Sequence, residues 1–385
     1  MINELKKLNK LPLKTYKYLN LNELNLDKID YENKRYDSSN VIEDRKCGKL
    51  LISNNLDMIK YDDISNLEDN IQYGVSEELI QTNEKYHNAG KYIKINQDML
   101  VAKPITLNYI LDDKNNVLID KNIIMAEESS SSTIILNYTN DNTTSNNKEK
   151  KANENLHNGQ TKLYAKNNSI VHLIVFQNLS KISKNFNSIV SYIGKNAKVY
   201  VTIIELGAQT SIVNYVGDLI ADNAKQNLNT IYYTKDSDIL DLDYNIIQKG
   251  QNTKSDIQVK GVMDDKSKKA FKGTIDFKKG SKKAIGSESE DVILMSPDVK
   301  CDSVPTLLCT EEDVSGSHAA SIGKIDKEKL FYIMSRGLTY NQAQNVIIDA
   351  MFSKIIDKII NEEIRQKIRY QIQRRLENED AGANI

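Results

Sequence analysis

The chain has little of several residue types on which folds and active sites depend. Tryptophan is absent, and 385 residues contain four prolines, four histidines and three cysteines. Cys47, Cys301 and Cys309 are too few for a disulfide framework, and none has the CxxC spacing of a zinc or redox motif. A reducing compartment is the simplest location for such a chain, so we expect a cytoplasmic protein.

Other absences limit the possible functions. No run approaches the ~20 apolar residues of a membrane span, and the polar, Lys-rich start has no apolar signal segment. The net charge of −1 gives no general attraction to nucleic acid or to anionic membranes. Walker A, GxGxxG, HExxH and GxSxG motifs are all missing. We therefore expect neither nucleic-acid nor membrane binding, no motif-bound cofactor and no active site of the chain's own.

The sequence divides into three stretches of different texture. Residues 1–85 mix short helical patterns with polar linkers and include a helix at 76–85 with Ser76 as N-cap. Residues 86–321 are dominated by short runs of strand-forming residues separated by turn-formers. Clear examples of these runs lie at 92–95, 132–136, 170–176, 199–204 and 228–233. Residues 322–385 are helical, so we predict three regions with these boundaries.

A weak repeat indicates how the central runs are arranged. Related tripeptides begin at Asn167, Asn196 and Asn223, immediately before three of the strand-like runs. Stacked coils of a β-solenoid leave this kind of signature. Periodicity alone leaves a β-sandwich equally open. Residues 137–158 contain few large apolar side chains, which predicts a mobile loop projecting from the central region.

The third stretch carries clear helix boundaries. Asp326 can cap a helix through Met334, with Gly337 as its left-handed stop. Residues 339–342 form a capping box for a second helix, from Asn341 to about Ile360. Isoleucine then recurs every fourth residue from 356 to 372, followed by Leu376. We expect this apolar stripe to pack within the C-terminal domain.

From residue 272 onward the chain resembles the SufB/SufD family of iron–sulfur cluster assembly scaffolds. The motifs are PTLL at 305–308, EDV at 312–314, SHAASIGKID at 317–326 and LFYIMSRGL at 330–338. Residues 93–105, ending in KPI, and 16–19 also resemble the family pattern. The resemblance implies a mainly β fold, a right-handed parallel β-helix flanked by N-terminal and C-terminal helical regions. It favours the solenoid over the sandwich.

Two departures point to the SufD branch. SufB-type scaffolds usually carry a cysteine six residues before the proline that Pro305 matches, and a glutamate after the histidine. Here these positions hold Val299 and Ala319. The resemblance implies a scaffold that pairs with SufB, or with itself, and docks the ATPase SufC. It would receive sulfur indirectly from a cysteine desulfurase and share a transient iron–sulfur cluster with SufB.

The resemblance also selects candidate residues. His318 matches a histidine that faces the partner subunit in SufD-type proteins, and a neutral imidazole can bind iron. The alternative is a loop histidine that only packs or hydrogen-bonds. Cys301 and, more weakly, Cys309 could bind iron or carry a persulfide, or they could be ordinary strand cysteines. The acidic run 311–313 could join a metal shell or form a solvated turn.

The resemblance implies SufC docking on the C-terminal helices, for which Tyr332, Arg336 and Gly337 are the candidates. Two alternative functions stay open. The chain could be a homodimeric, SufB-like scaffold in which Cys301 accepts sulfur. It could instead be a β-helix carbohydrate-active enzyme, since Asp236, Asp238, Asp241 and Asp243 form an alternating acidic run.

Overall fold

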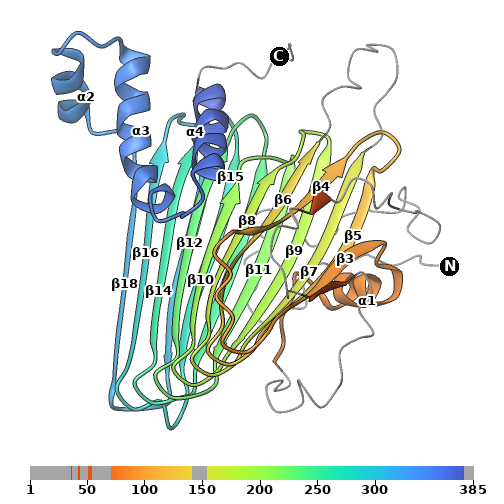
Figure 1. The fold of residues 1–385 in the computed structure, drawn as a ribbon. Helices are drawn as coiled ribbons and strands as arrows, with labels where there is room; N and C mark the ends of the chain where they lie inside the picture. Colours follow the sequence, from red (N-terminus) through yellow and green to blue (C-terminus); the bar gives the residue numbers. More distant parts are fainter. Residues whose placement is uncertain (1–35, 37–41, 44–50, 54–70, 141–153, 377–385) are drawn as a thin grey trace.

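The chain winds as a parallel β-helix. The computed structural model describes residues 36, 42–43, 51–53, 71–140 and 154–376. From β3 onward, successive strands alternate between two facing sheets, so that each coil contributes one strand to each sheet (Figure 1). This confirms the predicted fold class. It excludes the sandwich, whose strands would be antiparallel.

β1 and the even-numbered strands from β4 onward form sheet A. Their order is β1 (Ile42–Glu43), β4 (Ile105–Leu111), β6 (Ser131–Asn140), β8 (Ile170–Asn178), β10 (Lys198–Glu205), β12 (Lys225–Thr234), β14 (Lys254–Met263), β16 (Ala284–Leu294) and β18 (Val314–Gly323). Sheet B has the order β17 (Lys300–Cys309), β15 (Lys268–Phe277), β13 (Ile239–Gln248), β11 (Thr210–Leu219), β9 (Ser183–Ile193), β7 (Asn155–Ala165), β5 (Val117–Ala126), β3 (Ala89–Ile95) and β2 (Leu51–Ser53).

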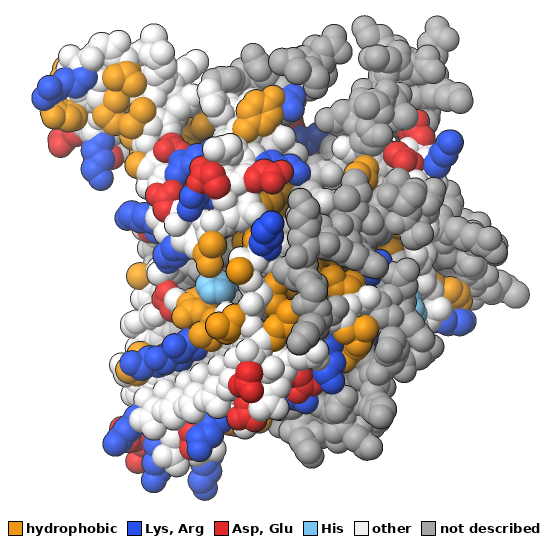
Figure 2. Space-filling view, viewed as in Figure 1, with side chains coloured by type: hydrophobic (Ala, Val, Ile, Leu, Met, Phe, Trp, Pro, Cys, Tyr) orange, Lys and Arg blue, Asp and Glu red, His pale blue; other side chains and the backbone are white. Residues whose placement is uncertain are grey.

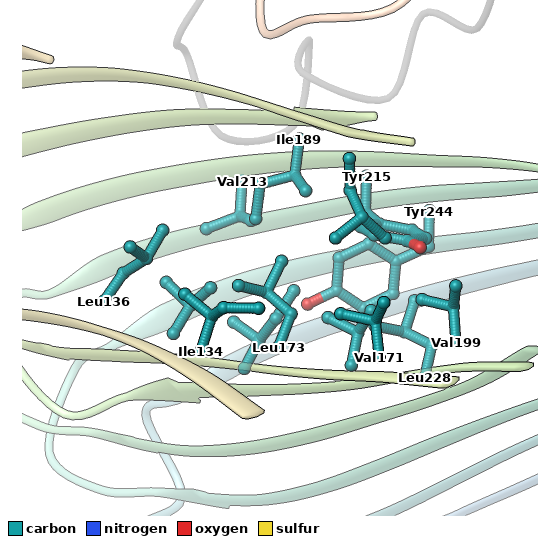
Figure 3. Packing of buried hydrophobic residues seen from close by; sticks show 14 of the residues in the cluster. Ile134, Leu136, Val171, Leu173, Ile189, Val199, Val213, Tyr215, Leu228 and Tyr244 are labelled. Carbon is teal, nitrogen blue, oxygen red and sulfur yellow. The ribbon is translucent and has the colours of Figure 1, made fainter. Parts of the chain in front are cut away.

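The interior between the sheets, which we call the lumen, is filled by alternate side chains of every strand. Leu173 of β8, Val201 of β10 and Leu228 of β12 occupy the same position in successive coils and are fully buried. Figure 3 shows side chains such as Ile189 and Val213 of sheet B meeting those of sheet A. Each fully buried aliphatic side chain stabilises the fold by about 1.5–3 kcal/mol.

Stacked asparagines mark the turns that the sequence repeat predicted. Asn168, Asn196 and Asn223 all have left-handed backbones, with φ of 60°, 58° and 60°. The Asn196 amide donates to Asn168 Oδ1 at 3.0 Å, and the Asn223 amide donates to Asn196 Oδ1 at 3.0 Å. Among the three repeats, the residue that aligns with Asn196 and Asn223 is thus Asn168 and not Asn167. Asparagine tolerates the left-handed backbone better than most residues, which explains its recurrence at this turn.

The first coil is covered by the chain that precedes it. β1 and β2 pair antiparallel with β4 and β3, within a region that we predicted to be helical. They cover strand edges that would otherwise expose unpaired backbone groups. α1 (Glu77–Tyr86) begins as predicted, with Ser76 Oγ accepting from the Leu79 amide at 3.1 Å. The remaining residues before 71, apart from Tyr36, lie outside the described part.

The predicted loop at 137–158 is shorter at both ends. β6 continues to Asn140 and β7 begins at Asn155, leaving 141–153 outside the described residues. Residues at the first of these ends find partners in the neighbouring coil, which the sequence did not reveal. Asn137 donates to Asn108 at 2.5 Å, and the Tyr138 ring stacks on Tyr109 with centroids 5.2 Å apart.

The helix boundaries of the C-terminal region largely follow the sequence signals. α2 (Lys327–Met334) is capped by Asp326, and Gly337 has φ of +94°. α3 (Tyr340–Ile356) starts with the predicted capping box of Thr339 and Gln342, but it ends four residues before the predicted Ile360. α4 (Glu362–Leu376) follows. In the described residues, no helix has the length and apolar run required to cross a membrane.

The isoleucine stripe packs within the C-terminal domain as predicted, against Ile348 and Phe352 of α3, but it also packs on the solenoid. Ile364, Ile368 and Ile372 join a cluster with residues on the outer face of sheet A. Those strand residues are Ile135, Ile174, Phe176, Ile204, Ile231, Tyr233 and Val262. The outer face of this part of the sheet is itself apolar and has to be covered. α3 and α4 are therefore fixed to the solenoid, while α2 stands clear of the strands (Figure 1).

Candidate functional site at the open end of the solenoid

The last coil differs from the others because no further coil follows it among the described residues. Within these residues, β17 pairs only with β15 and β18 only with β16, so each is the edge strand of its sheet. Most residues of β18 are exposed, whereas those of inner strands such as β11 are buried. The described structure therefore presents two strand edges and the end of the lumen at one surface, which we call the open end.

His318 lies on β18 at this open end. It pairs in register with Glu288 of β16, and residues paired in parallel strands share one face of the sheet. Glu288 is buried with the lumen-lining residues Ala284 and Val292. His318 is thus on the lumen-side face, yet it is exposed because no further coil covers it. A side chain in this position is open to a partner.

The two cysteines lie on β17 in different environments. Cys301 is half-buried and Cys309 is exposed. Both lie on the lumen-side face, in register with Lys269 and Phe277 respectively, but their separation along the strand is about 26 Å at the usual rise per residue. Burial raises the pKa of the Cys301 thiol, and the positive charge of Lys269 opposes that shift.

The predicted residues do not form a complete metal site by themselves. No group of three or more His, Cys, Asp or Glu side chains in the described ranges is arranged to hold a metal ion. His318 and Cys301 come from different sheets at the same open end. Cys47 lies outside the described residues. Any cluster or iron bound at this surface would require further ligands from a partner.

A buried charged layer, which the sequence analysis missed, lies beneath the open end. Lys269 of β15 forms an ion pair with Glu290 of β16 across the lumen, and both side chains are almost fully inaccessible. Lys269 Nζ also donates to the Asp302 carbonyl oxygen at 3.1 Å. A signal was present, because Glu288 and Glu290 stand at i and i+2 of a strand and therefore share one face.

Glu288 belongs to the same layer, and its ionised form is disfavoured there. Burial, and then the neighbouring Glu290, raise its pKa to about 7. Its carboxylate crosses to sheet B and lies over Gly273, where any Cβ would come within 2.2 Å of an oxygen. Glycine at this position is what gives the side chain room. The layer can therefore hold or release a proton near neutral pH.

The acidic run at 311–313 contributes to a turn. Glu311 accepts a hydrogen bond from the Gly280 amide at 2.9 Å, which is the main cause of its lowered pKa. The Asp313 carbonyl oxygen accepts from the Lys283 amide at 2.6 Å. These contacts tie the turn before β18 to the previous coil, and they do not direct the carboxylates toward His318.

The predicted docking residues come together on α2. The Arg336 guanidinium lies over the Tyr332 ring, 5.1 Å from its centroid, and donates to its hydroxyl at 3.0 Å. Gly337 ends this helical segment with its left-handed backbone. Phe331 is 73% exposed and Tyr332 60% exposed. Figure 2 shows hydrophobic and charged side chains side by side on this protruding part.

The alternating aspartates do not gather into one site. Asp236 and Asp238 lie in a turn, and Lys181 pairs with both, at 3.3 and 2.6 Å. Asp241 and Asp243 lie on the outer face of β13, where burial raises the pKa of both carboxyl groups. The run is thus divided between two surfaces.

Comparison with known proteins gives one consistent result. The family model described as "SUF system FeS cluster assembly, SufBD core domain" matches residues 109–351, well over half of the chain. An iron–sulfur cluster assembly SufBD family protein of Pyrococcus horikoshii is 25% identical over 68% of this chain and 56% of its own length. The iron–sulfur cluster assembly protein SufD of Bacillus subtilis is 24% identical over 70% of this chain and 60% of its own. The chain thus matches under two thirds of the length of these relatives.

Proposed function

Because the chain belongs to the SufBD family of iron–sulfur cluster assembly proteins, we propose that it is a SufD-like scaffold subunit and not an enzyme. The observation that carries this proposal is the uncovered last coil, with His318 exposed on its lumen-side face. A scaffold holds partners in register, and a rigid solenoid with one open end suits that task. The three-region division of the chain and a location in the cytoplasm belong to the same proposal.

The open end is the surface where a second scaffold subunit would pair, either a SufB-type protein or another copy of this chain. Two unpaired edges favour the addition of strands from a partner. Apolar side chains stand on both, since Leu308 of β17 is 47% exposed and Ile322 of β18 is 39% exposed. Their burial would add to the backbone hydrogen bonds gained at the edges.

His318 is the side chain that would meet the cargo at this junction. A neutral imidazole binds iron, and the partner subunit would supply the remaining ligands. The cluster is cargo that is built and passed on. The exposure of His318 supports this role, because a histidine that only stabilised the fold would not need to face outward.

α2 is the surface on which a SufC-type ATPase would dock. Phe331, Tyr332 and Met334 expose apolar area beside Arg336, and aromatic and arginine side chains are typical of interface centres. α3 and α4 pack directly on sheet A. A movement imposed on α2 would therefore reach sheet A, whose edge strand β18 carries His318, through a packed connection.

Co-purification with SufB-type and SufC-type partners tests the proposal with separate variants. Ile322→Arg should abolish pairing with the second scaffold while leaving the ATPase bound. Tyr332→Ala should do the reverse, and Tyr370→Ala, an exposed tyrosine of α4, is the matched control. His318→Ala should keep both partners but lower cluster yield on anaerobic reconstitution. A wild-type chain that binds neither partner would refute the scaffold role.

A second candidate function has one specific observation in its favour. Cys301 is half-buried beside Lys269 at the open end, which suits a sulfur acceptor in a homodimeric scaffold supplied indirectly by a cysteine desulfurase. Under this function, Cys301→Ser would abolish cluster formation. Under the SufD-like function, the same change would leave the yield nearly unaltered.

A further inference from the structure

Cys301 is built into the buried charged layer, unlike an ordinary strand cysteine. Its register partner Lys269 is fully buried, on the same lumen-side face as Cys301. It forms the ion pair with Glu290 and donates to the Asp302 carbonyl oxygen, and its positive charge lowers the pKa of the Cys301 thiol against the effect of burial. A lysine is almost never fully buried unless its charge is paired, as it is here with Glu290.

A second observation indicates that the layer is incomplete without a ligand. The Tyr232 hydroxyl is fully buried and has no hydrogen-bond partner among the described residues. Its ring lies over Gly261 of the next coil, where a Cβ would be 1.9 Å from Cζ, so the hydroxyl extends toward the last coils. There it is electrostatically coupled to Glu290 and Cys301. A buried donor without an acceptor is costly.

Cys309 provides an internal comparison. It lies on the same strand and the same face, and it is more exposed than Cys301. Its register partner is Phe277, which offers neither a charge nor a hydrogen-bond donor. Exposure alone would make Cys309 the more reactive thiol. The charged layer beside Cys301 would instead make Cys301 the more reactive of the two thiols.

We propose that Lys269 is a positioning residue that makes Cys301 a persulfide acceptor, with the Tyr232 hydroxyl as the second donor to the added sulfur. The Cys301 thiolate attacks the outer sulfur of a donor persulfide, R–S–SH. A new S–S bond forms on Cys301, the donor's S–S bond breaks, and the leaving thiolate takes the proton that Cys301 lost. No net oxidation occurs. This inference deepens the second candidate function and rests on it.

The test is persulfide transfer to the full-length chain under anaerobic conditions, with cysteine persulfide as donor. Peptide mass spectrometry then measures the rate at which each cysteine gains a sulfur atom. We expect Cys301 to react faster than Cys309. Lys269→Met should slow Cys301 about tenfold, as expected for one charge-assisted hydrogen bond, without affecting Cys309. Lys269→Arg should restore most of the rate.

Two further variants keep the result interpretable. Lys300→Met removes an exposed neighbouring charge and should change nothing, whereas Tyr232→Phe should slow Cys301 to a lesser extent than Lys269→Met. If Lys269→Met unfolds, Lys269→Met with Glu290→Gln avoids leaving a buried unpaired carboxylate. Equal rates for the two cysteines, or an unchanged Cys301 rate in both Lys269 variants, would overturn the inference. Partner binding, tested by co-purification, can fail without affecting this readout.

Discussion

Both halves of the lumen bury a polar pair that includes a carboxylate, but the hydrogen-bonding atoms of the two pairs are satisfied to different extents. In the early coils, His157 Nε2 lies 2.7 Å from Asp120 Oδ1, and His157 Nδ1 lies 2.5 Å from Asn185 Oδ1. Asp120 also accepts from Tyr138 and Asn122, at 2.9 and 2.6 Å. Every hydrogen-bonding atom of this pair therefore has a partner within the chain.

In the last coils, Lys269 and Glu290 form a pair whose neighbours are less complete. Glu290 Oε2, Glu288 Oε2 and the Tyr232 hydroxyl are buried without hydrogen-bond partners in the described structure. Fully satisfied buried networks stabilise and specify a fold, whereas incomplete ones often mark a place where something else binds. The comparison separates a structural network from a candidate site that the sequence alone could not distinguish.

The largest effect should come from breaking the complete network. Asp120→Ala leaves His157 buried without its carboxylate, which typically costs about 3–5 kcal/mol. Urea unfolding followed by circular dichroism would measure the loss. Asp298→Ala, which removes an exposed carboxylate from a turn, is the control and should change stability little. A loss no larger than the control's would contradict the structural role of the network.

The pH dependence of stability should differ between the middle and the end of the lumen. Burial raises the pKa of Glu205 from 4.5 to about 8 and that of Glu288 from 4.5 to about 7. Each folded carboxyl holds its proton more tightly than the unfolded one, so the free energy of unfolding falls as pH rises through that window. The slope is about 1.4 kcal/mol per pH unit for each group.

Glutamine substitutions test this dependence. Glu205→Gln should remove its share of the slope up to about pH 8, and Glu288→Gln only up to about pH 7. Thermal unfolding from pH 5 to pH 9 would resolve the two windows. A variant whose pH profile is identical to that of the wild type would show that the carboxyl it lacks is not shifted.

Replacing the incomplete pair should be nearly harmless. The double variant Lys269→Met with Glu290→Leu exchanges a buried ion pair for apolar groups, which is often neutral or stabilising. We expect a stability change within about 1.5 kcal/mol, against a larger loss for Lys269→Met alone. Urea unfolding of the three proteins checks this. If the double variant lost as much as Asp120→Ala, the two pairs would be structurally equivalent.

A moderate effect is expected in the stacked asparagine turns. Asn196→Ala places a Cβ-bearing residue without a polar side chain in the left-handed region, at a cost of about 1–2 kcal/mol. It also removes the amide contacts with Asn168 and Asn223. Asn196→Gly, which keeps the backbone favourable but loses the same contacts, separates the two contributions in a thermal melt.

Local features of the fold were predictable from sequence, and contacts between distant segments were not. The caps at Ser76, Asp326 and Thr339 depend on side chains within three residues, so their sequence signals sufficed. The partner of the isoleucine stripe and the one-residue offset at Asn168 depend on strands that are distant in the chain. Neither is encoded in a short window.

In the candidate site too, some residues could be found from sequence motifs and others only from contacts between distant strands. His318 and Cys301 were found through a motif, which carries family information about position. Lys269, Glu290 and Tyr232 belong to three different strands, and only the register of the coils brings them beneath Cys301. Apart from the i, i+2 spacing of Glu288 and Glu290, their sequence contexts resemble those of ordinary strand residues, so no local pattern marked Lys269 or Tyr232.

The position of the last coil at the end of the described stack has a consequence for local unfolding. In a stacked architecture each layer is held by the layers next to it, so a terminal layer with one neighbour opens most readily. Amide hydrogens of β18 should exchange with deuterium before those of β10, and unravelling should proceed from there toward α1. A partner bound at the open end would give the last coil a second neighbour. Amide hydrogen exchange should then slow in β18 and, to a smaller extent, in the coils that precede it.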